Sequence, residues 1–198
     1  SAAGRFIPGL AYAWETNETQ DSWSFRLQKH VRFHSGELLT ARDVRCTLMR
    51  LMERCETNEA GMKIIAPYRG LFRELAEISE SGEHGLLIQL HKPVPDLLTL
   101  LASPPASIVP AERPPDFAYR PIGTGPFRLL RPDERCLMLE AFPDYYLRRA
   151  NMDRIEMWYL PRYHFGGAFG HGDPSEGIGL NFLHYREAEG ALEQDGWR

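Results

Sequence analysis

The hydrophobic repeat of this sequence changes from two residues to about 3.6 within its N-terminal quarter, and this change restricts the fold class more than any other feature. Residues 10–15 and 22–28 alternate apolar and polar side chains, as strands with one buried face do. The polar residues between them are typical of a turn, so the two segments predict a β-hairpin. From residue 44 to residue 52, apolar side chains then recur at helical spacing.

The start of this helix is marked by Thr40 and Asp43. Threonine is a good N-cap residue, and we expect its hydroxyl to accept the amide proton of Asp43. Asp43 stands at the third helical position, where its carboxylate can accept a hydrogen bond from Thr40 in return. Its negative charge there also interacts favourably with the positive end of the helix dipole. We therefore interpret Asp43 as a capping residue rather than a functional acid.

The rest of the chain mixes hairpins with separate helices, which predicts an α+β (mixed α/β) fold. Segment 72–81 is ambiguous, and residues 104–117 form a rigid connector because five of these fourteen residues are prolines. The other predicted elements are a strand at 85–93, a helix at 94–103, a brief strand at Ser107–Val109, a hairpin of 125–132 with 135–143, a strand at 154–161, and a helix at 180–196 after a glycine-rich loop.

Composition bounds the function classes. The net charge is −4, so we expect no nucleic-acid contact by phosphate neutralisation in this segment. No apolar run approaches 18 residues, so no membrane span is expected. The three cysteines, an odd and widely spaced set, argue against a disulfide framework and slightly favour a reducing compartment.

No catalytic or metal-binding motif is apparent. Gly-x-Ser-x-Gly, His-Glu-x-x-His and Cys-x-x-Cys are all missing from the sequence. His164, His171 and Asp173 share a glycine-rich stretch, but their spacing does not favour a metal site. We therefore expect no catalytic residue, no metal and no cofactor, and we keep a hydrolase centred on this stretch as a remote alternative.

The stretch Gly123-Thr124-Gly125-Pro126 raises the question of a phosphate-binding loop. Such loops place a helix N-terminus behind the glycines, and P-loops continue with Gly-Lys-Ser/Thr. Here a strand-like segment follows instead. The simpler interpretation is a tight turn where the backbone approaches another group, with a direct ligand contact as the alternative.

The order of the motifs resembles the extracellular solute-binding protein family 5. That family has a "tFkLR"-type strand, a "vkFhdG" turn and a "TAeDV" helix start, and here Phe25-Arg26-Leu27, Val31–Gly36 and Thr40–Val44 stand in these positions. "PIGTGPFRLL", "LEAFPDYY" and "MDRIEMWYLP" are similar to later motifs of the family. The resemblance covers roughly Leu10 to Pro161.

The resemblance implies a non-catalytic, solute-binding domain of the two-lobed periplasmic-binding-protein type II fold. Residues 1–161 would form its N-terminal lobe, and residues 162–198 would lead toward the hinge or second lobe. "AFPDYY" departs from the family pattern and is more similar to the solute-binding half of cytoplasmic transcriptional regulators of sugar-phosphate stress. An effector-sensing role in the cytoplasm is therefore expected, with a periplasmic component of a peptide-type ABC transporter as the alternative.

The resemblance also suggests partners and site residues. The expected partners are a small solute (an oligopeptide, sugar or sugar phosphate), the second lobe of the same protein and, for a transporter, an ABC permease. Gly123, Thr124 and Gly125 would offer backbone contacts to ligand or hinge, and Tyr119 and Arg120 would line the cleft. A buried strand edge with an exposed salt bridge is the alternative for these residues.

Overall fold

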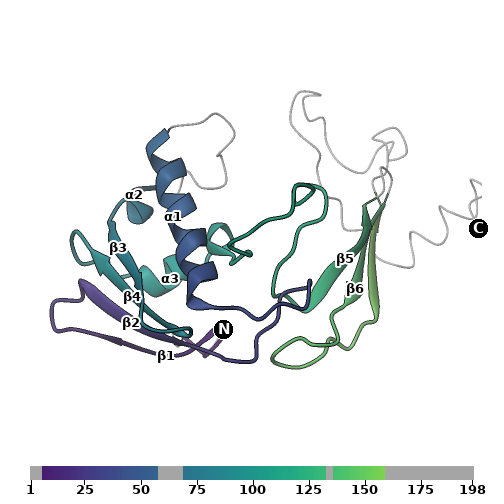
Figure 1. Cartoon of the computed structure of the whole chain (residues 1–198), viewed down its shortest axis with the longest axis horizontal. Coiled ribbons are helices and arrows are strands. Elements are labelled where there is room, and N and C mark those ends of the chain that lie inside the picture. The colour runs from purple at the N-terminus through teal and green to yellow at the C-terminus, as the bar shows by residue number, and fades with distance from the viewer. Residues whose placement is uncertain (1–5, 58–68, 133–135, 159–198) are drawn as a thin grey trace, which may run out of the picture.

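A computed structural model of the chain describes residues 6–57, 69–132 and 136–158. Two antiparallel sheets lie at opposite ends of this part of the molecule, joined by extended segments (Figure 1). The elements in chain order are β1 Ala11–Thr16, β2 Ser22–Leu27, α1 Ala41–Thr57, α2 Arg69–Phe72, β3 Leu75–Glu80, β4 Gly85–Leu90, α3 Leu97–Leu101, the 3-10 turn η2 Pro104–Ala106, β5 Phe127–Pro132, β6 Cys136–Ala141 and β7 Arg154–Trp158.

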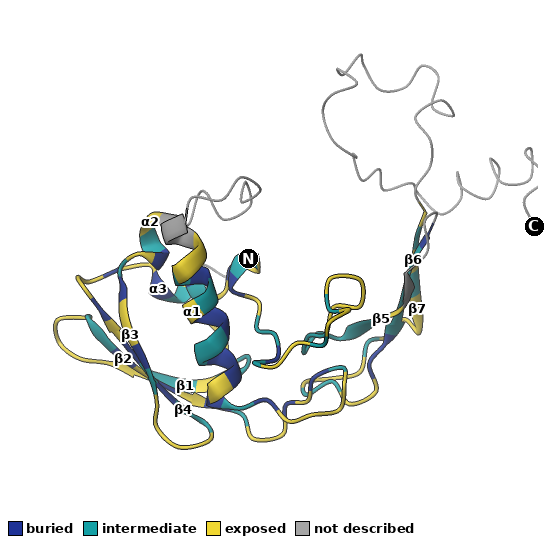
Figure 2. Ribbon diagram, turned by 45° about the horizontal axis from the view of Figure 1, so that its top comes forward, coloured by how far each residue is buried: buried dark blue, intermediate teal, exposed yellow. Residues whose placement is uncertain are grey.

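The N-terminal body is a four-stranded sheet in the order β1-β2-β4-β3, with α1 across one face. The alternation in β2 buries Trp23, Phe25 and Leu27, and Phe25 pairs with Leu86 on β4. The core lies between this sheet and the apolar side of α1, where Leu48 is 1% exposed (Figure 2). The predicted first hairpin and the main helix are both confirmed.

The second body is the three-stranded sheet β5-β6-β7, and its two faces differ in polarity. Residues paired across an antiparallel sheet share a face. One face carries the charged row Arg128, Glu140 and Arg154. The opposite face is apolar and consists of Phe127, Leu129, Leu137, Leu139, Ala141, Ile155 and Met157. Except for the buried alanine, these apolar residues are only partly buried.

One sequence prediction differs from the structure, and one ambiguous segment takes a defined structure. Ser107–Val109 is not a strand, because the backbone N–H and carbonyl of Val109 bond to the hydroxyl of Thr47 on α1. The ambiguous segment 72–81 supplies the end of α2 and the edge strand β3. The predicted glycine-rich loop and the helix at 180–196 lie outside the described residues.

Among the residues that the structure describes, no helix is long and apolar enough to cross a membrane.

The predicted cap of α1 is present with a different arrangement of hydrogen bonds. The carboxylate of Asp43 accepts the backbone N–H and the hydroxyl of Thr40, each at 2.8 Å. The Asp43 amide donates to the Thr40 carbonyl at 3.2 Å rather than to the hydroxyl. The other carboxylate oxygen accepts the N–H of Ala111 at 2.8 Å. Asp43, only 9% exposed, therefore both caps the helix and fastens the proline-rich connector to it.

Replacing Asp43 should destabilise the protein far more than replacing its neighbour Arg42. Asp43→Ala leaves the N–H groups of Thr40 and Ala111 without their acceptor, at a cost of about 1–3 kcal/mol. Arg42 reaches the same connector through an exposed ion pair with Glu112, so Arg42→Ala should cost less than about 1 kcal/mol. Urea unfolding of the two variants checks this, and equal losses would contradict the role of Asp43.

Candidate functional site

The two bodies meet where His34 contacts the glycine turn at residues 123–125. His34 follows the buried Phe33 in a loop that reverses at Gly36, whose φ of +93° suits glycine. The backbone N–H of His34 donates to the Gly123 carbonyl at 2.9 Å. The Gly123 N–H donates to His34 Nδ1 at 3.2 Å, and His34 Nε2 lies 3.1 Å from the Gly125 carbonyl.

These contacts fix the protonation state of His34. Nδ1 accepts a hydrogen bond from Gly123, so it carries no proton, and Nε2 must hold the proton that it donates to Gly125. The neutral Nε2–H tautomer therefore satisfies both partners. Burial, opposed by the Gly125 hydrogen bond and aided by the charge of Arg128, lowers the pKa of His34 below its ordinary value.

The segment 142–146 forms a second contact between the bodies. The N–H of Phe142 donates to the Pro126 carbonyl at 2.8 Å, and its ring meets the His34 ring edge-on at 5.1 Å. Tyr146 packs against the core of the N-terminal body and lies 4.9 Å, ring to ring, from Tyr145. The acidic-aromatic stretch Phe-Pro-Asp-Tyr-Tyr thus supports the glycine turn from the other side.

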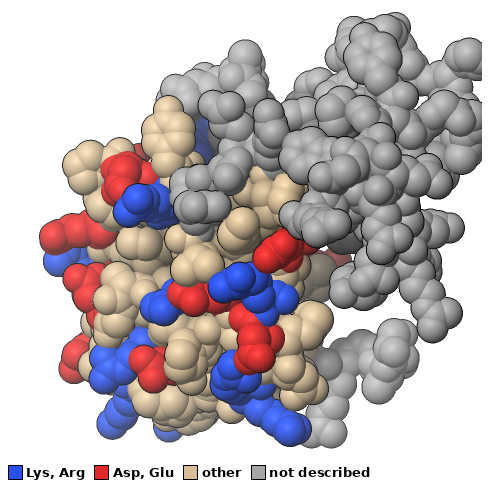
Figure 3. Space-filling model, turned by 90° about the vertical axis from the view of Figure 1, so that its right-hand side faces the viewer, with Lys and Arg blue, Asp and Glu red and all other residues tan. Residues whose placement is uncertain are grey.

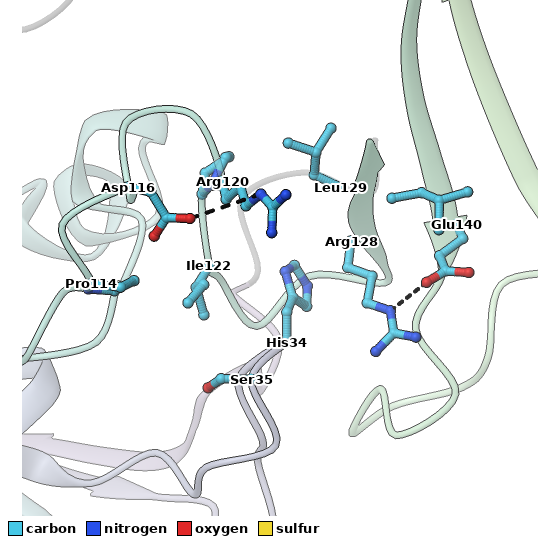
Figure 4. A pocket seen from close by; sticks show the side chains of 11 residues that line it. His34, Ser35, Pro114, Asp116, Arg120, Ile122, Arg128, Leu129 and Glu140 are labelled. Atoms are coloured by element: carbon cyan, nitrogen blue, oxygen red, sulfur yellow. Dashed lines mark hydrogen bonds and ion pairs between the residues drawn. The ribbon is translucent and has the colours of Figure 1, made fainter. Parts of the chain in front are cut away.

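A cavity of about 370 Å³ opens beside this joint (Figure 4). The guanidinium groups of Arg120 and Arg128 lie on either side of the His34 ring. The residues that line the cavity are His34, Ser35, Pro114, Asp116, Arg120, Pro121, Ile122, Arg128, Leu129, Leu130 and Glu140. It therefore combines an apolar wall with a few charged groups, the usual composition of a small-molecule site.

The two arginines are engaged to different degrees. Arg128 Nε donates to Glu140 at 2.7 Å, and both side chains are partly buried. Arg120 Nε stands 3.8 Å from Asp116, too far for a hydrogen bond, and the Arg120 side chain is 73% exposed. Arg120 is therefore the cation that a ligand can recruit at little cost, while Arg128 is held in place by its carboxylate partner.

The sequence-predicted site residues fall at different distances from this cavity. Arg120 lines it, whereas Gly123 and Gly125 do not line it and are connected to it only through their hydrogen bonds to the lining residue His34. Thr124 lies between these glycines and is partly buried, whereas Tyr119 is 77% exposed and does not line the cavity. Neither glycine has positive φ, and a Cβ on Gly123 would meet His34 Cε1 at an ordinary 3.8 Å.

Of the five ionisable residues that line the cavity, the sequence predicted only Arg120 and not His34, Asp116, Arg128 or Glu140. His34 stands inside the "VRFHSG" motif, which was assigned only to a turn. Arg128 and Glu140 sit at matching positions of the second hairpin, so the predicted hairpin contained the signal for their pairing. The stretch with His164, His171 and Asp173 lies outside the described residues, and those residues contain no group of three potential metal ligands.

The hydroxyl of Tyr146 should resist ionisation. Burial is the main reason that its pKa rises from 10.0 to about 12, and Tyr145 adds to the effect. Because the folded pKa is raised, Tyr146 contributes stability that is complete below pH 10.0 and is lost as the pH rises through about 12.

Absorbance at 295 nm, which follows tyrosinate, tests this prediction. The native protein should show a component that titrates near pH 12, and Tyr146→Phe should remove that component and reduce the loss of stability above pH 10.0. Tyr12→Phe, at an exposed position on β1, is the matched control. If the absorbance titration of Tyr146→Phe above pH 10.0 were the same as that of the native protein, the Tyr146 hydroxyl would not be buried at the joint.

Known proteins are similar to this chain in sequence. The family described as "Bacterial extracellular solute-binding proteins, family 5 Middle" matches residues 5–164. The HTH-type transcriptional regulator SgrR of Pectobacterium atrosepticum is 31% identical over 201 residues, which cover 98% of this chain and 32% of the regulator. SgrR of Yersinia pestis (strain Pestoides F) is 32% identical over 160 residues, which cover 80% of this chain and 26% of the regulator. The chain thus spans roughly a quarter to a third of these curated relatives.

A solved structure shares the fold. The binding protein MoaA from A.tumefacien R10, in complex with mannopinic acid, superposes with a TM-score of 0.68 at 26% identity. The match covers 78% of this chain and 31% of MoaA, so the expected mixed α+β fold with one lobe of a two-lobed binding protein is confirmed. Together with the match over residues 5–164, this shows that the chain belongs to the bacterial extracellular solute-binding proteins of family 5.

Proposed function

We propose that this chain is part of the effector-sensing domain of a bacterial transcriptional regulator, and that it binds a small polar solute without chemical conversion. The observation that carries the proposal is the 31% identity to a transcriptional regulator along 98% of the chain. The fold is that of a solute-binding protein, and the joint between its two sheets borders a cavity with charged groups. A sensor of this kind works by binding its effector more tightly in one conformation than in another.

The proposed ligand contacts are Arg120 and the turn of Gly123, Thr124 and Gly125, with Tyr119 beside them. The loosely paired guanidinium of Arg120 suits a carboxylate or phosphate, and the turn adds backbone groups near the His34 ring. The proposed ligand is an oligopeptide, a sugar or a sugar phosphate. MoaA, which shares the fold, is in complex with mannopinic acid.

We further propose that residues 1–161 belong to the N-terminal lobe and that residues 162–198 lead toward the second lobe. The apolar face of the sheet β5-β6-β7, defined above, supports a larger protein around this chain, because such a face gains stability when it is covered. The chain also covers only 31% of MoaA, so a second lobe of the same protein is the proposed partner.

The proposed location is the cytoplasm, where a transcriptional regulator acts. The charge distribution agrees with a sensory rather than a DNA-contacting segment. The net charge is −4, and on the face shown in Figure 3 the described basic and acidic side chains alternate rather than gathering by sign. DNA contact is therefore assigned to another part of the protein.

A periplasmic substrate-binding component of a peptide-type ABC transporter is the second candidate. It is favoured by the fold of MoaA, a binding protein in complex with a small acid. A reporter of transcription and an uptake assay separate the two roles. If the protein is a regulator, deletion of the gene that encodes it should abolish the response of its target promoters to the effector. If the protein serves a transporter, the same deletion should abolish uptake of the solute.

Calorimetric titration of the full-length protein with sugar phosphates, sugar acids and short peptides tests the proposed site. Arg120→Ala should weaken binding of an anionic solute about tenfold or more, since a charged hydrogen bond contributes about 1.5–3 kcal/mol. Arg42→Ala removes a similarly exposed arginine on α1 and should leave affinity unchanged. Binding that Arg120→Ala does not weaken would move the site elsewhere, and no binding by any solute class would contradict the proposed function.

A further inference from the structure

The strongest feature outside the proposed ligand contacts is the set of hydrogen bonds around His34. We infer that His34 is a positioning residue that bonds to the Gly123 amide of the glycine turn only while its imidazole is neutral, so that acidification loosens the turn. This effect on the turn needs no ligand and does not depend on the proposed function. Its consequence, a loss of solute binding at low pH, rests on the proposed function.

The donor and acceptor pattern carries the first step. A proton added to His34 goes to Nδ1, the ring nitrogen that accepts the Gly123 N–H at 3.2 Å. Two N–H donors then face each other, and the Gly123 amide loses its acceptor. The contact from Nε2 to the Gly125 carbonyl survives, because Nε2 keeps its proton in both states. Acidification therefore breaks one specific contact of the joint.

The surroundings of His34 oppose its charge. The charged groups that face it are Arg128 and Glu140 from β5 and β6, and Asp116 and Arg120 from the connector. Glu140 is bonded to Arg128 at 2.7 Å, and Asp116 has Arg120 nearby, so each carboxylate is already matched by a guanidinium. The fifth neighbour is the uncharged ring of Phe142, which lies in a T-shaped arrangement with the imidazole. Nothing in this set favours an imidazolium.

The direction of the pH effect follows from linkage. Burial lowers the pKa of His34 from the ordinary value of 6.5, with Arg128 acting in the same sense and the Gly125 hydrogen bond against it. A base with a lowered folded pKa binds fewer protons in the folded state than in the released state. The contact is therefore fully stable above pH 6.5 and is lost as the pH falls through the folded pKa.

The glycine turn transmits this loss to the site. Gly123 and Gly125 lie between the connector that carries Arg120 and the strand that carries Arg128. A turn whose Gly123 N–H no longer bonds to His34 holds the separation of these two guanidiniums less firmly, because only the contacts to the Gly123 and Gly125 carbonyls remain. The proposed site should therefore bind an anionic solute less well at low pH, although both arginines keep their charge.

Hydrogen–deuterium exchange of the full-length protein tests the release without any ligand. The probe is the amide of Gly123, followed in peptides that contain residues 121–126 and corrected for the intrinsic exchange rate at each pH. Protection should fall roughly tenfold for each pH unit below 6.5, until the folded imidazole also becomes charged. The amides of β2 and β4, in the core of the N-terminal body, serve as the internal reference.

Three variants distinguish the effect of the hydrogen bonds of His34 from the effect of its ring packing. His34→Asn keeps an acceptor near the position of Nδ1 and should show protection that does not depend on pH. His34→Gln keeps a donor that can reach the Gly125 carbonyl, and His34→Phe keeps only the ring; both should leave Gly123 weakly protected at every pH. If His34→Phe does not fold, the comparison of wild type with His34→Asn still decides the question.

Two results would overturn the inference: wild-type protection of Gly123 that is independent of pH, or the same pH dependence in His34→Asn as in wild type. Calorimetry at pH 7.5 and 5.5, two pH values chosen for the experiment on either side of the ordinary histidine pKa of about 6.5, tests the consequence. A pH-dependent turn in a protein that binds no solute at either pH would support the role of His34 and contradict the proposed function instead.

Discussion

The hydrogen bonds between His34 and the glycine turn are the interaction on which the arrangement of this chain depends. They join residues 89 and 91 positions apart in the sequence, and they bring together two sheets that share no strand. The ring of Phe142 and the packing of Tyr146 converge on the same place. The cavity beside the joint exists because these contacts set the position of one body against the other.

Closing so long a loop is costly in chain entropy, and the connector between the bodies reduces that cost. Its prolines restrict the unfolded chain. It is also fastened along α1: Thr47 bonds to Val109, Asp43 to Ala111, and Arg50 to the Pro110 carbonyl. The glycine turn is therefore delivered to His34 by a segment that is already immobilised, and α1 serves both as the cover of the core and as the support of the connector.

The sequence predicted the features that depend on neighbours in the chain. The hairpins, the main helix and its cap follow from periodicity and from short-range hydrogen bonding. The role of His34 could not be predicted this way, since its partners are distant in sequence. The brief strand at Ser107–Val109 was wrong for the same reason: the hydroxyl of Thr47, 62 positions away, binds the backbone that an adjacent strand would have bound. Segment 72–81, which contains β3, stayed ambiguous because the burial of β3 does not alternate.

The register of β5 and β6 couples the site to the rest of the protein. Arg128 pairs with Glu140 on the charged face of the sheet, and Leu129 pairs with Leu139 on the opposite, apolar face. Arg128, Leu129 and Glu140 all border the cavity, which lies at this edge of the sheet. Because side chains alternate, a slip of one residue would exchange the two faces of a strand and separate Arg128 from Glu140. Burial of the apolar face by the rest of the protein would oppose such a slip. The pairing of Arg128 with Glu140 at the cavity is thus maintained by packing on the apolar face of the same sheet.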